Sequence, residues 1–237
     1  MHIPDGYLSL QTAVPLVVAM VPIWRIAVRK VKKNLRKREV PVLAVGAAFS
    51  FTIMMFNLPI PGGSSAHAVG AVLLAILLGP WSACVGVSVA IIIQALIFGD
   101  GGILAIGANC FNMAFMMPMV GYLVYKMVKG QANPVSTRGI IAAAVAGYMG
   151  INVAALCTAV EFGSQYYLFQ AADGTPLYFM YPLKVAVAAM MSEHLIFAGP
   201  VEAIVTSLGM FFVGNNYPEL IVRKQAVAFK EGAADNV

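Results

Sequence analysis

Long apolar stretches, each bounded by turn-forming or basic residues, run through this sequence from end to end. Of its 237 residues, 60% are hydrophobic and only 11% are charged, and the mean hydropathy is +0.83. A soluble domain carries about a quarter charged residues, whereas a helix that crosses a bilayer needs about 20 mostly apolar ones. The sequence therefore predicts an all-α integral membrane protein with a single membrane domain.

The apolar stretches predict seven membrane-spanning helices. Gly79-Pro80 divides the stretch 66–98 into a short span, expected to start at His67, and a longer one. Residues 161–180 are expected to form an external loop with an aromatic belt. Gly199-Pro200 leaves open whether 182–213 is one kinked helix or two short ones. The remaining spans are expected at 8–28, at 40–59, over about 25 residues from 103, and at 140–160.

The basic residues cluster in a way that predicts the orientation of these helices. Eight of the 15 Lys and Arg residues fall between Arg25 and Arg38. Because positive charge favours cytoplasmic loops, the N-terminus is expected outside and the C-terminus inside, which leaves only Lys184 on the outer side. The predicted parts are an N-terminal segment with the first helix and basic loop (1–39), a six-helix core (40–213) and a cytoplasmic tail (214–237). This clustering indicates topology rather than nucleic-acid binding.

The chain starts Met1-His2-Ile3-Pro4-Asp5-Gly6, which favours a metal site at the amino terminus. No cleavable signal is evident, because the basic cluster follows the first apolar stretch, and the bulky His2 disfavours removal of Met1. An α-amino group, the residue 2 amide nitrogen and the His2 imidazole can chelate one cation as two fused rings. A second imidazole would complete a plane of four nitrogens, which suits Ni(II) or Cu(II).

His67 is the predicted fourth ligand, because it lies on the same outer face in a chain with only three histidines. A structural histidine is the alternative, with Ser64 and Ser65 as helix caps. If His67 binds metal, Ser64 and Ser65 are expected to surround the site. Asp5 could accept a hydrogen bond from a ligand N–H or belong to a turn. Asn109 and Asn112, at helical spacing, could surround the site or join helices. His194, beside Glu193, is expected to have an interior hydrogen-bonding role, with a part in the transport path as the alternative.

Several other activities find no support in the sequence. The three cysteines lie in apolar stretches without Cys-x-x-Cys spacing, so a disulfide frame or thiolate site is not indicated. No phosphate-binding loop and no His-Glu-x-x-His zinc motif is present, so the chain is expected neither to hydrolyse ATP nor to be an enzyme.

Three motifs together resemble a known family. They are 1–8, 63–67 (Gly-Ser-Ser-Ala-His) and 98–102 (Phe-Gly-Asp-Gly-Gly) with 107–109 (Gly-Ala-Asn). The chain resembles the nickel and cobalt substrate-binding subunits of energy-coupling factor transporters, the NikM/CbiM family, from Met1 to about Phe212. The resemblance implies metal ligands at Met1, His2 and His67, and an N-terminal helix added to a six-helix core.

The same resemblance implies a transmembrane coupling subunit and two ATPase subunits as partners, in the cell membrane. Ala44 and Ala48 are similar to the small-residue motif that contacts the coupling subunit. Pro4-Asp5-Gly6 departs from the cobalt branch, so Ni(II) is favoured over Co(II) as substrate, and planar nitrogen ligation agrees with that choice. The rival hypothesis is a proton-coupled metal carrier or channel, for which Glu193, His194 and Glu202 are the available groups.

Overall fold

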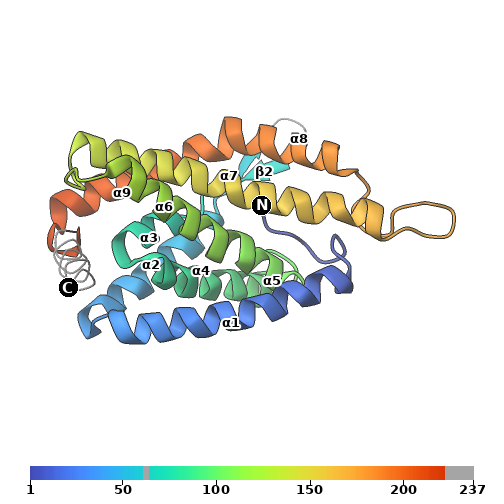
Figure 1. The fold of residues 1–237 in the computed structure, drawn as a ribbon, viewed down its shortest axis with the longest axis horizontal. Coiled ribbons are helices and arrows are strands. Elements are labelled where there is room, and N and C mark those ends of the chain that lie inside the picture. Colours follow the sequence, from blue (N-terminus) through green and yellow to red (C-terminus); the bar gives the residue numbers. More distant parts are fainter. Residues whose placement is uncertain (61–63, 222–237) are drawn as a thin grey trace, which may run out of the picture.

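The computed structural model describes residues 1–60 and 64–221, with Ser64 as backbone only, and it consists mainly of helices packed side by side along one direction (Figure 1). The tail residues Arg223, Lys224 and Lys230 lie outside this described part. The helices and strands, in chain order, are α1 (Leu10–Asn34), η1 (Lys37–Glu39), α2 (Val40–Met54), β1 (Leu58–Ile60), β2 (Ser64–Ala66), α3 (Ala71–Leu78), α4 (Pro80–Ile93), η2 (Gln94–Phe98), α5 (Ile106–Asn109), η3 (Cys110–Met116), α6 (Met117–Lys129), α7 (Thr137–Leu168), α8 (Leu183–Glu193), η4 (His194–Ala198) and α9 (Gly199–Asn216).

Four of the described helical stretches are long and apolar enough to cross a membrane. They are Leu10–Asn34, Pro80–Phe98, Thr137–Leu168 and Leu183–Asn216. Helices α2 and α3 are shorter, at 15 and 8 residues, so the count of seven spans stays a prediction.

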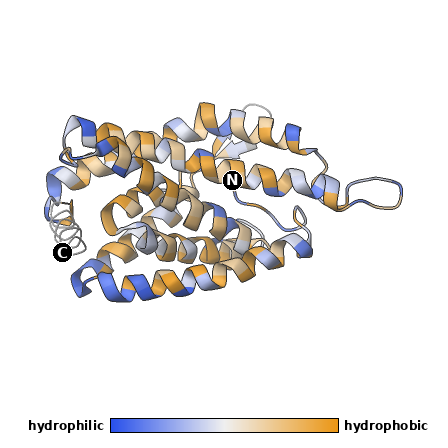
Figure 2. Ribbon diagram, in the orientation of Figure 1, coloured by the Kyte–Doolittle hydropathy of each residue, from blue (hydrophilic) through white to orange (hydrophobic). Residues whose placement is uncertain are grey.

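Helix α1 shows why the protein belongs in a membrane. Its side chains Val14, Val18 and Val21 are 53%, 62% and 56% exposed, and large apolar side chains are also exposed on α4, α7 and α9. Hydrophobic residues recur along all of these helices (Figure 2). In water, exposed apolar surface costs about 25 cal/mol per Å², whereas acyl chains solvate it. This outer surface and the long apolar helices indicate a membrane protein.

The predicted break at Gly79-Pro80 is confirmed. Helix α3 ends at Leu78, Gly79 takes a positive φ of 89°, and α4 begins at Pro80. The expected start of the short helix at His67 is wrong, because α3 begins four residues later, at Ala71. Gly70 has a φ of 71° and ends an extended segment that carries His67, preceded by the two-stranded hairpin β1–β2, which the sequence did not predict.

The expected external loop at 161–180 is also partly wrong. Helix α7 continues to Leu168, and the loop starts only after it. The longer helix is stabilised from both sides, because the Glu161 carboxylate accepts a hydrogen bond from Asn112 (2.8 Å) and the Phe162 ring stacks on Phe179 at 4.6 Å. Polar Glu161 made the helix appear to end early.

The open question about residues 182–213 is answered in favour of one helix. Helix α8 runs through the π-helical turn η4 into α9 without interruption. Pro200 follows the π-helical turn η4 directly, and local π-helical adjustments make a proline tolerable within a membrane helix.

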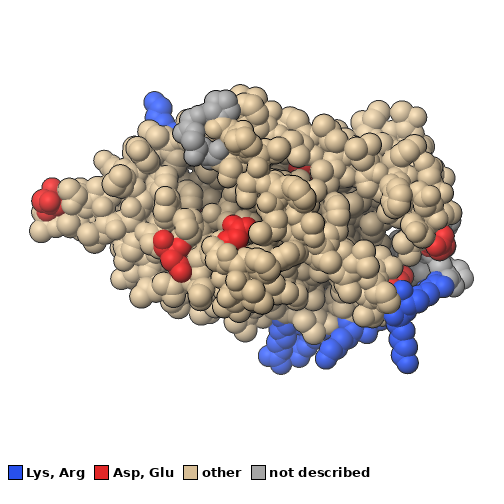
Figure 3. All heavy atoms as spheres, turned by 180° about the vertical axis from the view of Figure 1, so that it is seen from behind, with Lys and Arg blue, Asp and Glu red and all other residues tan. Residues whose placement is uncertain are grey.

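Lys and Arg side chains gather at the end of the molecule where α1 finishes (Figure 3). Lys32 and Lys33 lie in the last turn of α1, and Lys126 and Lys129 in the last turn of α6. The predicted orientation, with this end in the cytoplasm, requires such clustering; the orientation itself stays a prediction.

Candidate metal site

The first nine residues fold back into the molecule instead of extending from it. The N-terminus lies in the middle of the bundle, whereas α1 starts at one end (Figure 1). Ile3 is fully buried. The Asn109 side chain binds the Ile3 backbone twice: Ile3 N donates to Oδ1 (2.8 Å) and Nδ2 donates to the Ile3 carbonyl (3.1 Å). Gly102 N donates to the same carbonyl (2.8 Å). These bonds fix the backbone next to His2.

Asp5 holds the same segment against the loop before α5. Its carboxylate accepts hydrogen bonds from Ile103 N (3.1 Å) and Leu104 N (2.9 Å). A Cβ atom at Gly102 would collide with Asp5, so only glycine allows this approach. The observed partners of Asp5 are therefore loop amides, and its predicted contact with a ligand N–H stays a prediction.

The two predicted ligand rings meet. His2 Nδ1 lies 3.1 Å from His67 Nε2, and the ring centroids are 4.9 Å apart. His67 Nδ1 lies 3.1 Å from the carbonyl oxygen of Ala68. Because that oxygen can only accept, His67 Nδ1 carries the proton, and the lone pair of Nε2 faces His2 Nδ1, where it could bind a metal ion instead.

The segment that carries His67 is clamped from two helices. The Glu202 carboxylate of α9 accepts hydrogen bonds from Val69 N (2.7 Å) and Gly70 N (3.1 Å). The hydroxyl of Ser50 in α2 donates to the Val69 carbonyl (2.5 Å). A buried carboxylate thus satisfies amides of the segment before α3, and His67 stays in an extended segment.

Burial keeps the two candidate imidazole ligands uncharged. The His2 side chain is only 6% exposed, and desolvation, aided by the positive amino terminus, lowers the pKa of His2 to about 3. The same causes lower the pKa of His67 well below its usual value, and desolvation lowers the pKa of the Met1 amine. Asp100 Oδ1 lies 3.6 Å from His2 Nδ1, but the neutral ring makes this a polar contact and not an ion pair.

The spacing of the two imidazole nitrogens is close to that of neighbouring ligands in a planar chelate. In a square-planar complex with metal–nitrogen bonds of about 2.0 Å, neighbouring nitrogens lie about 2.8 Å apart. The two imidazole nitrogens are at 3.1 Å, and the amino terminus is close enough to both rings to influence their protonation. No group of three or more His, Cys, Asp or Glu side chains gathers within the described residues.

Gln94 is a site residue that the sequence did not reveal. It is fully buried in the π-helical turn η2, and its side chain raises the pKa of His2, against the larger effect of burial. His2 Nε2 and Gln94 Oε1 are both buried without a hydrogen-bond partner in the part of the chain that the structure covers. A metal ion on Nδ1 would place the His2 proton on Nε2, where Gln94 Oε1 can accept it.

The other predicted residues lie at varying distance from the rings. Asn112 donates to Thr158 and Glu161, so it joins helices. Ser65 donates weakly to Asn57 and lines a cavity beside His2. The side chain of Ser64 is outside the described residues. Ala44 and Ala48 lie exposed on α2, where a partner helix could reach them. Glu202, like Gln94, was missed as a site residue, although an ionisable group within an apolar stretch is a signal for one.

Comparison with known proteins identifies the family. Residues 2–220 match the cobalt uptake substrate-specific transmembrane region, CbiM. The chain belongs to the CbiM family.

Similar CbiM-related proteins are named as metal transporters. The chain is 51% identical over 231 residues to the fused nickel transport protein NikMN of Rhodobacter capsulatus, and 50% identical over 220 residues to the probable fused nickel transport protein LarMN of Lactiplantibacillus plantarum. It covers only 67% and 66% of those longer proteins. A crystal structure of a truncated transition metal transporter superposes with a TM-score of 0.84 at 55% identity, covering 90% of this chain and 98% of that one.

Replacing Asn109 tests how this CbiM protein holds its N-terminal segment. Asn109→Leu removes both bonds to Ile3, and each unsatisfied buried group costs about 1–3 kcal/mol. We expect metal affinity to fall about 10- to 100-fold, measured by isothermal titration of purified protein with Ni(II). Asn133→Leu, in an exposed turn, is the control. If Asn109→Leu binds Ni(II) with unchanged affinity, the hydrogen bonds between Asn109 and Ile3 are not needed to hold the metal ligands in place.

Replacing Gln94 tests the proton acceptor of His2. Gln94→Leu is expected to weaken Ni(II) binding about 10- to 100-fold, which is the usual cost of losing such a partner. Gln94→Glu keeps an acceptor oxygen and should bind better than Gln94→Leu in the same titration. Equal affinities in the two variants would contradict the assigned role.

Proposed function

We propose that this protein is the substrate-binding subunit of an ATP-driven nickel uptake system of the energy-coupling factor type. The observation that carries the proposal is the meeting of the His2 and His67 imidazoles beside a buried amino terminus. With Met1 as the mature first residue, the ligands are its amine, the His2 amide nitrogen, His2 Nδ1 and His67 Nε2.

The arrangement explains how a bare ion is held in a membrane protein. Ni(II) would replace one proton of the Met1 ammonium group and the proton of the His2 amide, so one divalent cation enters as two protons leave and the net charge does not change. The carboxylates of Asp100 and Glu193, which raise the pKa of the amine, offset the remaining positive charge. Ile3, which is fully buried, would shield the neighbouring part of the complex from water.

Nickel is the favoured substrate, with Co(II) as the alternative. A plane of four nitrogens suits Ni(II). Relatives named for nickel transport are 51% and 50% identical to this chain, whereas a cobalt transport protein CbiM of Acetohalobium arabaticum is 37% identical over 133 residues. Both facts support the same choice.

Energy for transport comes, in this proposal, from partners: a transmembrane coupling subunit, which would contact Ala44 and Ala48 on α2, and two ATPase subunits. Seven spans in the cell membrane, with the amino terminus outside, would expose the chelate to external metal. The hydrogen bonds that Glu202 accepts from Val69 N and Gly70 N argue against the rival proton-coupled carrier, because they give this carboxylate a structural role. Uptake by vesicles that lack the partners, driven by a proton gradient, would favour the carrier.

One added residue tests the chelate. An extension before Met1 converts the amine into an amide, which binds metal only after losing a proton, so Ni(II) affinity should fall at least about 100-fold. His67→Ala should also weaken binding strongly. The control is one residue inserted between Asp173 and Gly174, in the loop after α7, which should leave affinity unchanged. Tight binding by the extended protein would disprove the chelate.

The affinity should depend steeply on pH. Each proton released on binding changes the affinity about tenfold per pH unit, and the pKa of the Met1 amine is lowered by burial. Where the amine is already unprotonated, only the amide proton leaves, and the affinity should fall about tenfold for each pH unit. At lower pH, where the amine is protonated, both protons must leave, and the affinity should fall about 100-fold for each pH unit. Titrations at several pH values, with proton release followed in weak buffer, measure this. An affinity that does not change with pH would exclude amide ligation.

A further inference from the structure

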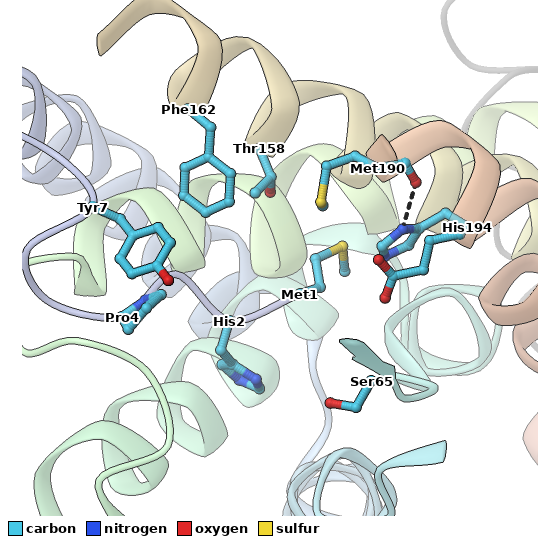
Figure 4. A pocket seen from close by; sticks show the side chains of 10 residues that line it. Met1, His2, Pro4, Tyr7, Ser65, Thr158, Phe162, Met190 and His194 are labelled. Atoms are coloured by element: carbon cyan, nitrogen blue, oxygen red, sulfur yellow. Dashed lines mark hydrogen bonds between the residues drawn. The ribbon is translucent and has the colours of Figure 1, made fainter. Parts of the chain in front are cut away.

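A cavity of about 330 Å³ lies beside the His2–His67 pair, between the N-terminal segment and helices α7 and α8 (Figure 4). Six waters of a hydrated divalent ion occupy about 180 Å³ at the density of liquid water, so the cavity is large enough for such an ion. Its lining includes nitrogen, oxygen and sulfur donors. They belong to Met1, His2, Ser65, Met190, Glu193 and His194.

His194 is prepared to bind a cation there. Its ring is 1% exposed, and Nδ1 lies 2.8 Å from the Met190 carbonyl, the contact drawn as a dashed line in Figure 4. Nδ1 must donate to this carbonyl, so Nε2 is unprotonated and available as a ligand. His194 also starts the π-helical turn η4, and π-helical turns are frequent at functional sites.

The lining of the cavity places this wall next to the chelate. Met1 and His2 line the cavity from the N-terminal segment, and Glu193 and His194 line it from the junction of α8 and η4. Both side chains therefore face the same space as the predicted ligands, yet neither belongs to the four nitrogens.

We propose that His194, with Glu193, forms a transient capture site for a partly hydrated divalent transition-metal ion on its way to the four-nitrogen chelate. The inference rests on the proposed function. His194 Nε2 would replace one water directly, and Glu193 would accept hydrogen bonds from the waters that remain. One imidazole and one carboxylate are too few to hold the ion tightly, so it can move on to the amine and His2.

Such a site has a kinetic purpose. Binding at the chelate requires the loss of several waters and of two protons within a closed space. Exchanging the waters stepwise, first for His194 and then for the chelate nitrogens, avoids a bare ion in a low-dielectric site, where it would be very unfavourable. The cavity would therefore set the rate of binding, whereas the chelate sets the affinity.

Stopped-flow mixing of Ni(II) with the full-length protein in nanodiscs tests the proposal. His194→Asn keeps an N–H group near the Nδ1 position, for the Met190 carbonyl, and removes Nε2; Glu193→Gln removes only the charge. We expect both variants to slow association about tenfold. In His194→Asn, dissociation should slow by the same factor, so the equilibrium affinity is unchanged. Glu193→Gln also removes a charge that offsets the bound cation, so its affinity should fall as well. Ser192→Ala, an exposed neighbour whose hydroxyl donates to Ala189, is the control and should bind at the normal rate.

The outcomes separate this proposal from the proposed function. Unchanged association rates in both variants would overturn the capture site, as would weaker affinity with a normal association rate, because His194 would then stabilise the bound state. If the unmodified protein fails to bind Ni(II), the proposed function itself falls. A planar Ni(II) absorption spectrum with the normal band position in both variants shows that the chelate is intact while its rate of filling has changed.

Discussion

The candidate site depends on the two hydrogen bonds between the Asn109 side chain and the backbone of Ile3. A free amino terminus has many conformations, and fixing one residue costs about 1–2 kcal/mol. That cost is offset by the burial of Ile3 and by three hydrogen bonds of its backbone, two with Asn109 and one from Gly102 N. As a result, the amine and the His2 ring occupy one position inside the bundle, where His67 meets them.

The surroundings of the site follow from the requirements of a buried backbone. Backbone N–H and C=O groups that are shielded from water must find partners inside the protein. The segments around His2 and His67 are extended and cannot satisfy one another as helices do, so Asn109, Glu202 and Ser50 provide their partners. The same bonds that satisfy these segments also hold the two rings 3.1 Å apart. The stability of the segments and the arrangement of the rings therefore have one structural origin.

The features that the sequence predicted correctly depend on the chemistry of neighbouring residues. Gly79-Pro80 ended a helix because proline cannot continue one, and hydropathy located most of the helices. The choice of His2 and His67 followed from the chemistry of an amino-terminal chelate, and the two rings do meet. What was missed depends on distant partners. The extension of α7 past Glu161 requires Asn112, the late start of α3 requires Glu202, and the role of Asn109 toward Ile3 spans 106 residues of sequence. Gln94 gave no signal, because a buried amide resembles any polar residue within a helix.

The central claim is that four nitrogens of the amino terminus, His2 and His67 surround one ion in a plane. X-ray absorption at the nickel edge of the Ni(II)-loaded protein measures the ligand types and coordination geometry directly. The account predicts a four-coordinate planar spectrum with nitrogen neighbours and imidazole scattering from two rings. A six-coordinate spectrum dominated by oxygen, or one with sulfur neighbours from the methionines, would contradict it.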